Sequence, residues 1–345
     1  MEMRTLDRLI LDTAAEGDAS AITLDPTGAL TAAALGSGRP VLSVDSDYSR
    51  AHAAHATGAT VAGINEPLLI DDFLATHLPL TGASGIVAVG EMPKSLGRLD
   101  YLARSIAGAA ARAGMAAQVV FGGNNKHLAR SMNDVLAQSF DEVTASRGRG
   151  KFRCLVASGP RDVSYTPPTA NGFTAYGGVF SGTKADHGGT FLATVVADLG
   201  VTAGSDAEPT VLDLGCGNGS VAKQLLEAGA VTAGQITATD ADADAVLSAR
   251  ANLPGVTVTW DDAGSRFAEG SFDVIALNPP FHDRAGVDAT LVQHLLDGAR
   301  RLLAPGGELF MVHNSHLRYR GEVEKRFGRV QQAARNERFT VLRAG

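Results

Sequence analysis

Short apolar runs rich in β-branched residues alternate along the chain with longer stretches rich in alanine, leucine and arginine. The short runs are typical of buried strands, and the longer stretches are typical of helices. Strands that alternate with helices indicate βαβ units and a mostly parallel sheet, so we predict an α/β protein. The strands predicted in the C-terminal half are Thr210–Leu214, Gln235–Thr239, Thr257–Trp260, Phe272–Leu277, Glu308–His313 and Arg338–Arg343, and the helices are Phe191–Asp198, Val221–Ala228, Ala241–Asn252 and Ala289–Leu303.

The same order of elements occurs twice in the chain. A strand, a loop with proline, a helix and a second strand lead to Asn-x-His-Leu, first from residue 85 to 128 and again from 272 to 317. Any two α/β domains can share such an order, but both copies also close on an apolar strand. We therefore predict a duplication, with two tandem Rossmann-like domains of twisted parallel sheets and flanking helices.

Glycine, proline, serine and threonine are concentrated between the two copies, where no apolar period is sustained. This composition is typical of a connector. We predict a first domain at 1–157, a connector at 158–190 and a second domain at 191–345, which suits the length of 345 residues.

Composition sets limits on location and partners. No apolar run approaches the ~20 residues that span a bilayer, and the N-terminus lacks the layout of a signal peptide, so we expect a cytoplasmic protein without a membrane contact. The net charge of -7 means that any nucleic-acid contact must be local. The two cysteines, Cys154 and Cys216, form neither a disulfide framework nor a metal cluster, so we expect buried thiols and no metal.

The segment TVLDLGCGNGSVA at 210–222 places Gly215, Gly217 and Gly219 between a buried strand and a helix. Glycines there permit positive φ and close approach of a ligand to the unpaired N–H groups of the helix. A dinucleotide site would have the spacing G-x-G-x-x-G. The spacing G-x-G-x-G after Asp213 resembles motif I of class I methyltransferases, in which the acid approaches the methionine part of S-adenosylmethionine.

Acidic residues follow the next two predicted strands. Asp240 ends one strand, where it can accept hydrogen bonds from ribose hydroxyls, or alternatively cap the next helix. Asp261 and Asp262 follow the third strand. We favour Asp262 as the acceptor for the adenine amino group, with a simple turn as an equal alternative.

The segment FDVIALNPPFH ends a buried strand in a stiff loop, because Pro279 and Pro280 fix φ and lack N–H groups. An exocyclic amine is a poor nucleophile, since its lone pair is delocalised into the ring. The Asn278 side-chain oxygen and the Pro279 carbonyl can accept its hydrogens and aim the nitrogen at the methyl group. Phe281 can stack on the base. His282 either contacts the base or phosphate or is a structural loop residue.

The Asn-Pro-Pro-Phe-His sequence resembles motif IV of amino-group methyltransferases that act on nucleobases or on protein glutamine. Further segments resemble the guanine-N2 methyltransferases of small- and large-subunit ribosomal RNA. They are GGVFSGTKADHGGTFL at 177–192, the stretch at 302–330, MPKS at 92–95 and KHLARS at 126–131. One departure is an extra residue between Asp186 and Thr190, relative to Asp-x-Gly-Thr.

This resemblance implies methyl transfer from S-adenosylmethionine to N2 of a guanine in ribosomal RNA. It also implies that the N-terminal domain is a degenerate copy without cofactor binding, which holds RNA or maintains the fold. The sequence agrees, because that half lacks G-x-G-x-G. In addition, Glu91, Met92, Pro93 and Lys94 stand where Asn278, Pro279, Pro280 and Phe281 stand in the other half.

Basic residues cluster in two places, 126–153 and 318–329, and we hypothesise that the run Arg147–Arg153 touches RNA, with a solvated hairpin as the alternative. The predicted partner is ribosomal RNA or a ribosomal subunit, and we expect a monomer. Two other functions stay open: methylation of protein glutamine, and a non-catalytic RNA-binding assembly protein. Asp213, Asp240 and Asn278 together argue against the last, since a purely structural domain needs none of them.

Overall fold

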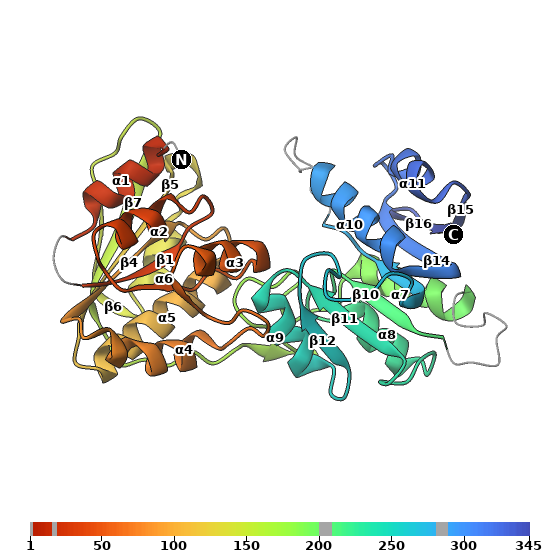
Figure 1. The fold of residues 1–345 in the computed structure, drawn as a ribbon, viewed down its shortest axis with the longest axis horizontal. Helices are drawn as coiled ribbons and strands as arrows, with labels where there is room; N and C mark the ends of the chain where they lie inside the picture. The colour runs from red at the N-terminus through yellow and green to blue at the C-terminus, as the bar shows by residue number, and fades with distance from the viewer. Residues whose placement is uncertain (1–2, 16–18, 200–208, 281–288) are drawn as a thin grey trace. The chain divides into compact units, whose positions relative to one another are not determined.

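A computed structural model describes residues 3–15, 19–199, 209–280 and 289–345. The contacts divide the chain into two units, Met1–Pro167 with Tyr176–Gly178, and Pro168–Ala175 with Val179–Gly345. Each unit contains a seven-stranded sheet flanked by helices (Figure 1).

In the first unit the strand order is β3-β2-β1-β4-β5-β7-β6, and the pairs of β7 with β5 and with β6 are antiparallel while the other pairs are parallel. The strands are β1 Ser20–Leu24, β2 Val41–Ser43, β3 Thr60–Val61, β4 Gly85–Glu91, β5 Ala116–Asn124, β6 Phe140–Ala145 and β7 Phe152–Pro160. The helices are α1 Thr5–Thr13, α2 Ala29–Gly36, α3 Tyr48–Ala56, α4 Ile70–His77, α5 Leu96–Arg112 and α6 Arg130–Leu136, with short 3-10 turns η1 Leu78–Thr81 and η2 Asn125–His127.

In the second unit the order is β12-β11-β10-β13-β14-β16-β15, again with the pairs of β16 antiparallel. The strands are β10 Val211–Leu214, β11 Ile236–Asp240, β12 Thr257–Trp260, β13 Phe272–Leu277, β14 Leu303–Asn314, β15 Val330–Arg335 and β16 Phe339–Ala344, and a separate hairpin holds β8 Thr169–Ala170 and β9 Phe173–Thr174. The helices are α7 His187–Leu199, α8 Ser220–Glu227, α9 Ala243–Asn252, α10 Ala289–Leu302 and α11 Arg320–Phe327.

The two sheets therefore share one topology, strand for strand, which confirms the prediction of two tandem Rossmann-like domains. In both sheets the chain order reverses at the first central strand, which is β1 in one and β10 in the other. Ligands of open α/β sheets bind at the carboxyl ends of the strands beside such a reversal. In the second unit this edge carries the residues that the sequence singled out.

One difference between the predicted and the observed elements occurs at a segment of proline and glycine. The helix predicted to end at Leu303 ends at Leu302, and Leu303 already pairs with Phe272. The register then shifts, so that Glu308 pairs with Val274. The Pro-Gly-Gly segment at 305–307, which follows the predicted helix, is thus an irregularity inside β14, as expected for glycine at a bulge.

Much of the stretch 158–190, which we expected to be a connector, packs with the second unit. It lacks an apolar period, but side chains of the second unit hold its backbone. The Nδ2 group of Asn218 donates to the carbonyls of Gly182 and Lys184, at 2.9 and 2.8 Å. The segment therefore contributes to the surroundings of the glycine loop.

Both cysteines are buried and free, as predicted. Burial raises the pKa of both thiols, so neither resembles an activated nucleophile. Among the described residues, no helix has the length and apolar character needed to cross a membrane, and no cluster of histidine, cysteine or acidic side chains could hold a metal ion.

Candidate active site

The glycine loop leaves the buried strand β10 and opens α8. Gly215, Gly217 and Gly219 have φ values of 74°, 55° and 83°, so all three need the left-handed conformation that glycine permits. A Cβ atom at Gly215 or Gly217 would meet nothing within 4 Å, whereas at Gly219 it would lie 2.8 Å from Leu253 Cδ1. The first two glycines therefore border open space for a ligand, and the third permits close packing behind the loop.

Asp213 lies in β10, beneath this loop, with only 1% of its surface exposed. Its Oδ2 accepts a hydrogen bond from the N–H of Ala222 in α8, at 3.1 Å. Burial raises the pKa of Asp213 to about 7, and the nearby charge of Asp240 acts in the same direction. A positively charged group bound beside the carboxylate would favour its ionised form.

Asp240 ends β11 and supports the loop from the side. Its Oδ2 accepts from the N–H of Gly217 and its Oδ1 from the N–H of Asp242, both at 2.9 Å. Burial raises the pKa of this carboxyl group, and the N–H groups partly offset that effect. A carboxylate offers about four acceptor sites, so two ribose hydroxyls could still bind it. The open glycines and this spare acceptor capacity fit an adenosine-containing cofactor.

The two aspartates after β12 have different surroundings. Asp261 is fully buried, where its Oδ2 accepts from Thr259 Oγ1 at 2.9 Å and its Oδ1 has no hydrogen-bond partner among the described residues. Asp262 is partly exposed and its Oδ1 lies 2.8 Å from His294 Nε2. Asp262 is thus the more accessible of the two, but it shares its carboxylate with a histidine that the sequence did not suggest.

Asn278 follows β13 at the same edge of the sheet. Its Nδ2 donates to Asp186 Oδ2 at 2.8 Å, and its Oδ1 is buried without a hydrogen-bond partner among the described residues. A carboxylate accepts but does not donate, so this contact fixes which end of the amide faces Asp186. The Asn278 oxygen is consequently left as an acceptor, and a buried acceptor without a donor is costly.

Asp186 is itself held by several groups. Its Oδ2 also accepts from the N–H of Gly189 at 2.7 Å, and its own N–H donates to Ser220 Oγ at 3.2 Å. Ser220 Oγ in turn donates to Asn218 Oδ1 at 2.5 Å. A chain of hydrogen bonds thus links the glycine loop with Asn278. Local sequence patterns do not reveal this role of Asp186, because Asp186 and Asn278 are 92 positions apart.

Glycines at the start of α7 allow this close approach. A Cβ atom on Gly188 would lie 3.2 Å from Asp186 Oδ2 and 3.4 Å from Asn278 Oδ1. On Gly189 it would lie 3.1 Å from Val221 Cγ2. Of the other loop residues, Pro279 is buried and Pro280 is half-buried, whereas Phe281 and His282 lie outside the described residues.

In the first unit, internal side chains occupy the equivalent positions. Asp25 follows β1 and accepts from the N–H of Thr31 at 2.8 Å, so its carboxylate closes the short loop that stands in place of the glycine loop. Glu91, at the end of β4, forms an ion pair with Arg4 at 2.6 Å. Arg4 precedes α1 as Asp186 precedes α7. The ion pair between Arg4 and Glu91 therefore takes the place of the hydrogen bond between Asp186 and Asn278 in the second unit.

The sheet order of the second unit, its glycine loop after the central strand and its acids at the ends of β10 and β11 define a class I methyltransferase, the class that uses S-adenosylmethionine. Comparison with known proteins agrees. Residues 170–343 match the Methyltransferase small domain family and residues 5–161 match the RLMG N-terminal domain. The chain belongs to the ribosomal RNA large subunit methyltransferase G family.

Several relatives bear that family name. The protein of Alcanivorax borkumensis is 30% identical over 98% of this chain and 89% of its own length. The protein of Pseudomonas aeruginosa is 35% identical over 66% of this chain, and the aligned region spans 63% of that relative. This chain is also similar to a solved structure, the T. thermophilus 16S rRNA N2 methyltransferase in complex with AdoMet and guanosine. The superposition covers 99% of this chain and 91% of that chain, with a TM-score of 0.75 and 22% sequence identity. At that identity the likeness supports the fold.

Proposed function

We propose that this protein transfers the methyl group of S-adenosylmethionine to the exocyclic N2 amine of a guanine in ribosomal RNA. The observation that carries the proposal is the Asn278 amide, whose nitrogen is engaged by Asp186 while its buried oxygen lacks a donor among the described residues. An amino group carries hydrogens that match this oxygen. A hydroxyl group as methyl acceptor would supply one hydrogen, whereas an amine supplies two. Two hydrogens suit this site, because the Asn278 oxygen is followed in the chain by the backbone carbonyl of Pro279, which is a second hydrogen-bond acceptor.

On the cofactor side, Gly215, Gly217 and Gly219 form the loop, Asp240 accepts from the ribose and Asp262 accepts from the adenine amino group. Asp213 lies near the methionine part, where an ammonium group would keep its carboxylate ionised. Asn278 borders the cofactor as well as the acceptor, because the carboxyl ends of β10 and β13 are adjacent in the sheet. S-adenosylmethionine supplies an electrophilic methyl group when it is bound.

On the acceptor side, Asn278 Oδ1 and the Pro279 carbonyl each accept one hydrogen of the amine. This turns the nitrogen lone pair out of conjugation with the ring and toward the methyl group. As the N–C bond forms and the S–C bond breaks, the nitrogen becomes positively charged and acidic, so its proton can pass to water without a strong base. Pro280 stiffens the loop. Phe281 and His282 remain proposed contacts to the base.

Ribosomal RNA as the substrate class is supported by the names of the relatives, and guanine N2 by the name of the similar solved structure. The surface of the first unit adds a physical argument. We use the name basic hairpin for the turn between β6 and β7 together with the first two residues of β7, whose exposed cations are Arg147, Arg149, Lys151 and Arg153. Arg149 forms an ion pair with Asp12 at 2.8 Å, and none of the other three cations forms one within the described part of the chain.

The basic cluster near the C-terminus differs in this respect. Arg320 pairs with Glu324, Lys325 with Glu322, and Arg326 with Asp297. Acidic neighbours therefore offset most of its charge, whereas the basic hairpin retains charge for phosphate groups. In this proposal the first unit is a degenerate methyltransferase domain that contacts RNA through the basic hairpin, and the second unit is catalytic.

The test is to incubate the protein with methyl-labelled S-adenosylmethionine and, separately, naked ribosomal RNA, small subunits and large subunits, and then to map the modified base. We expect label at N2 of a guanine in large-subunit RNA. Label in protein alone would refute the proposal in favour of glutamine methylation. Bound cofactor without label in any sample would refute it in favour of a non-catalytic assembly protein.

A further inference from the structure

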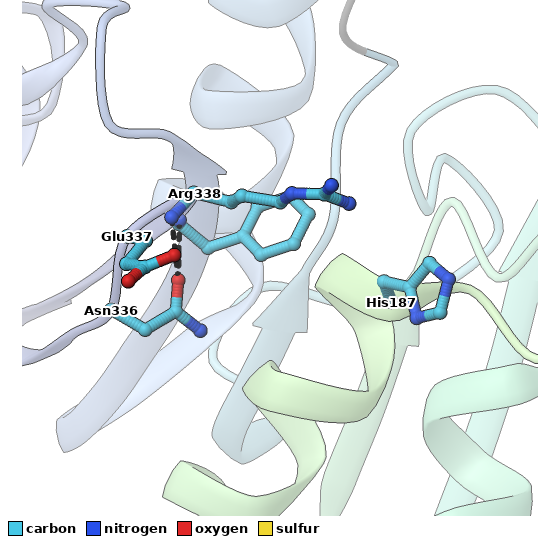
Figure 2. A pocket seen from close by; sticks show the side chains of 5 residues that line it. His187, Asn336, Glu337 and Arg338 are labelled. Carbon is cyan, nitrogen blue, oxygen red and sulfur yellow. Dashed lines mark hydrogen bonds between the residues drawn. The ribbon is translucent and has the colours of Figure 1, made fainter.

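The second unit contains a pocket of about 390 Å³ that lies outside the glycine loop and its acidic residues. Its lining residues are His187, Asn336, Glu337, Arg338 and Phe339 (Figure 2). His187 is the first residue of α7, and the other four form the turn between β15 and β16 and the start of β16. The volume lies at the small end of the range of about 300–1,000 Å³ that is common for small-molecule sites.

The sheet topology places this pocket beside the reacting atoms. Leu277, next to Asn278, pairs with Met311 in the parallel strand β14. Because β16 runs antiparallel to β14, its first residue, Phe339, pairs with Asn314 at the end of β14. Phe339 therefore lies at the same edge of the sheet as Asn278.

A second observation connects the pocket with Asn278 directly. A Cβ atom on Gly188 would lie 3.3 Å from Phe339 Cε1 and 3.4 Å from Asn278 Oδ1. The phenyl ring and the amide oxygen thus approach the same small residue, and His187 is its neighbour in the chain. Another pocket, around Gly307 and Gly345, lies at the opposite end of β16, where Ala344 pairs with Leu309, and so is remote from this edge.

The turn that forms the pocket wall is held by its own hydrogen bonds. Asn336 Oδ1 accepts from the N–H groups of Arg338 and Phe339, at 2.9 and 2.7 Å, and the Asn336 N–H donates to the Phe339 carbonyl at 2.9 Å. The turn is therefore preorganised. Figure 2 shows the guanidinium of Arg338 extending toward His187, and no ion pair is recorded for Arg338 within the described residues.

The chemistry of this wall matches a single unstacked nucleotide. Phenyl and imidazole rings bind bases by stacking, and an arginine without a carboxylate partner binds phosphate. We infer that this pocket receives the target nucleotide, with its base against Phe339 and His187 and its phosphate on Arg338. The inference rests on the proposed function, because it places the guanine amine beside Asn278.

The inference is tested by the affinity of the whole protein for guanosine 5′-monophosphate and for guanosine, measured by calorimetry or ligand-observed NMR. We expect the wild type to bind the nucleotide about tenfold more tightly than the nucleoside, as a charge-assisted contact allows. Arg338→Ala should abolish that difference and Arg338→Lys should retain part of it. His187→Ala and Phe339→Leu should weaken both ligands about tenfold through loss of stacking.

Arg335→Ala is the matched control. Arg335 is an exposed cation of the same β15–β16 hairpin that does not line the pocket. An equal loss of nucleotide affinity in Arg335→Ala and Arg338→Ala would overturn the inference, as would unchanged affinity in Arg338→Ala or a wild type that binds neither ligand. If the wild type binds the nucleotide through Arg338 but methylates no ribosomal RNA, the proposed function is refuted and the nucleotide site in the pocket stands. If Arg338→Ala and His187→Ala methylate RNA with an unchanged KM, the inference about the pocket is refuted and the proposed function stands.

Discussion

The hydrogen bond between Asn278 and Asp186 allows a quantitative prediction of kcat. A hydrogen bond to a charged group contributes about 1.5–3 kcal/mol, so the 2.8 Å contact favours the observed amide orientation over the rotated one by about 10- to 150-fold. Asp186→Ala removes that preference. A rotated amide would present its NH2 group to the acceptor amine, so that two donors would meet.

Because equal populations leave half of the amides in the productive orientation, we expect Asp186→Ala to lower kcat about twofold and to leave the Kd for S-adenosylmethionine nearly unchanged. The variant also removes the acceptor of the Gly189 N–H, which should cost about 1 kcal/mol of stability and is measured separately by the thermal midpoint. Asp186→Asn is the control, because its amide oxygen can take the place of Oδ2 and accept from both donors, which should restore kcat to nearly the wild-type value. A fall in the thermal midpoint with unchanged kcat, or equal kcat losses in the Ala and Asn variants, would refute a positioning role for Asp186.

Three further predictions concern the acceptor, the buried acid and the RNA contact. Asn278→Ala should lower kcat at least about 100-fold with cofactor affinity nearly intact, as measured by turnover and calorimetry; a large loss of cofactor affinity would mean that this side chain serves the cofactor instead. The pKa of Asp213 is raised to about 7 in the folded protein, so between about pH 4 and 7 the folded state binds a proton that the unfolded state has lost. The free energy of unfolding therefore falls as pH rises through this range, by at most about 1.4 kcal/mol per pH unit from this group. Asp213→Asn should remove that slope in denaturant titrations at several pH values, and an unaltered slope would contradict the assignment. Replacing the four cations of the basic hairpin by serine should weaken RNA binding and reduce the salt slope by about 2, at about 0.7 for each of the three cations without an ion pair among the described residues; an unchanged slope would show that RNA binds elsewhere.

The sequence was sufficient for the parts of the fold with strong local patterns. The strands β12 and β13 have the predicted bounds, since short apolar runs there are bordered by clear turn residues. By contrast, α11 and β15 were not predicted, because both are rich in charged or polar residues. The helix α7 begins four residues before its predicted start, since two glycines disfavour a helix locally while Asp186 stabilises its first turn.

The candidate site was predictable in its positions and not in its connections. Asp213, Asp240 and Asn278 follow from their places at strand ends, and the structure brings all three to one edge of the sheet. The carboxylate that orients Asn278 comes from a segment without a recognisable period. Its role depends on a tertiary contact between residues far apart in the chain, which local patterns cannot reveal.

The ion pair between Arg4 and Glu91 has a consequence for how the two halves of the protein can diverge. Arg4 bonds to Asp7 as well as to Glu91, so a change at position 91 alone would leave an arginine with one of its two carboxylates missing. An asparagine at the end of β4, as at the end of β13, would therefore require a coordinated replacement of Arg4 at the start of α1. The two positions are thus expected to change together, because either replacement alone leaves a charged group with fewer partners.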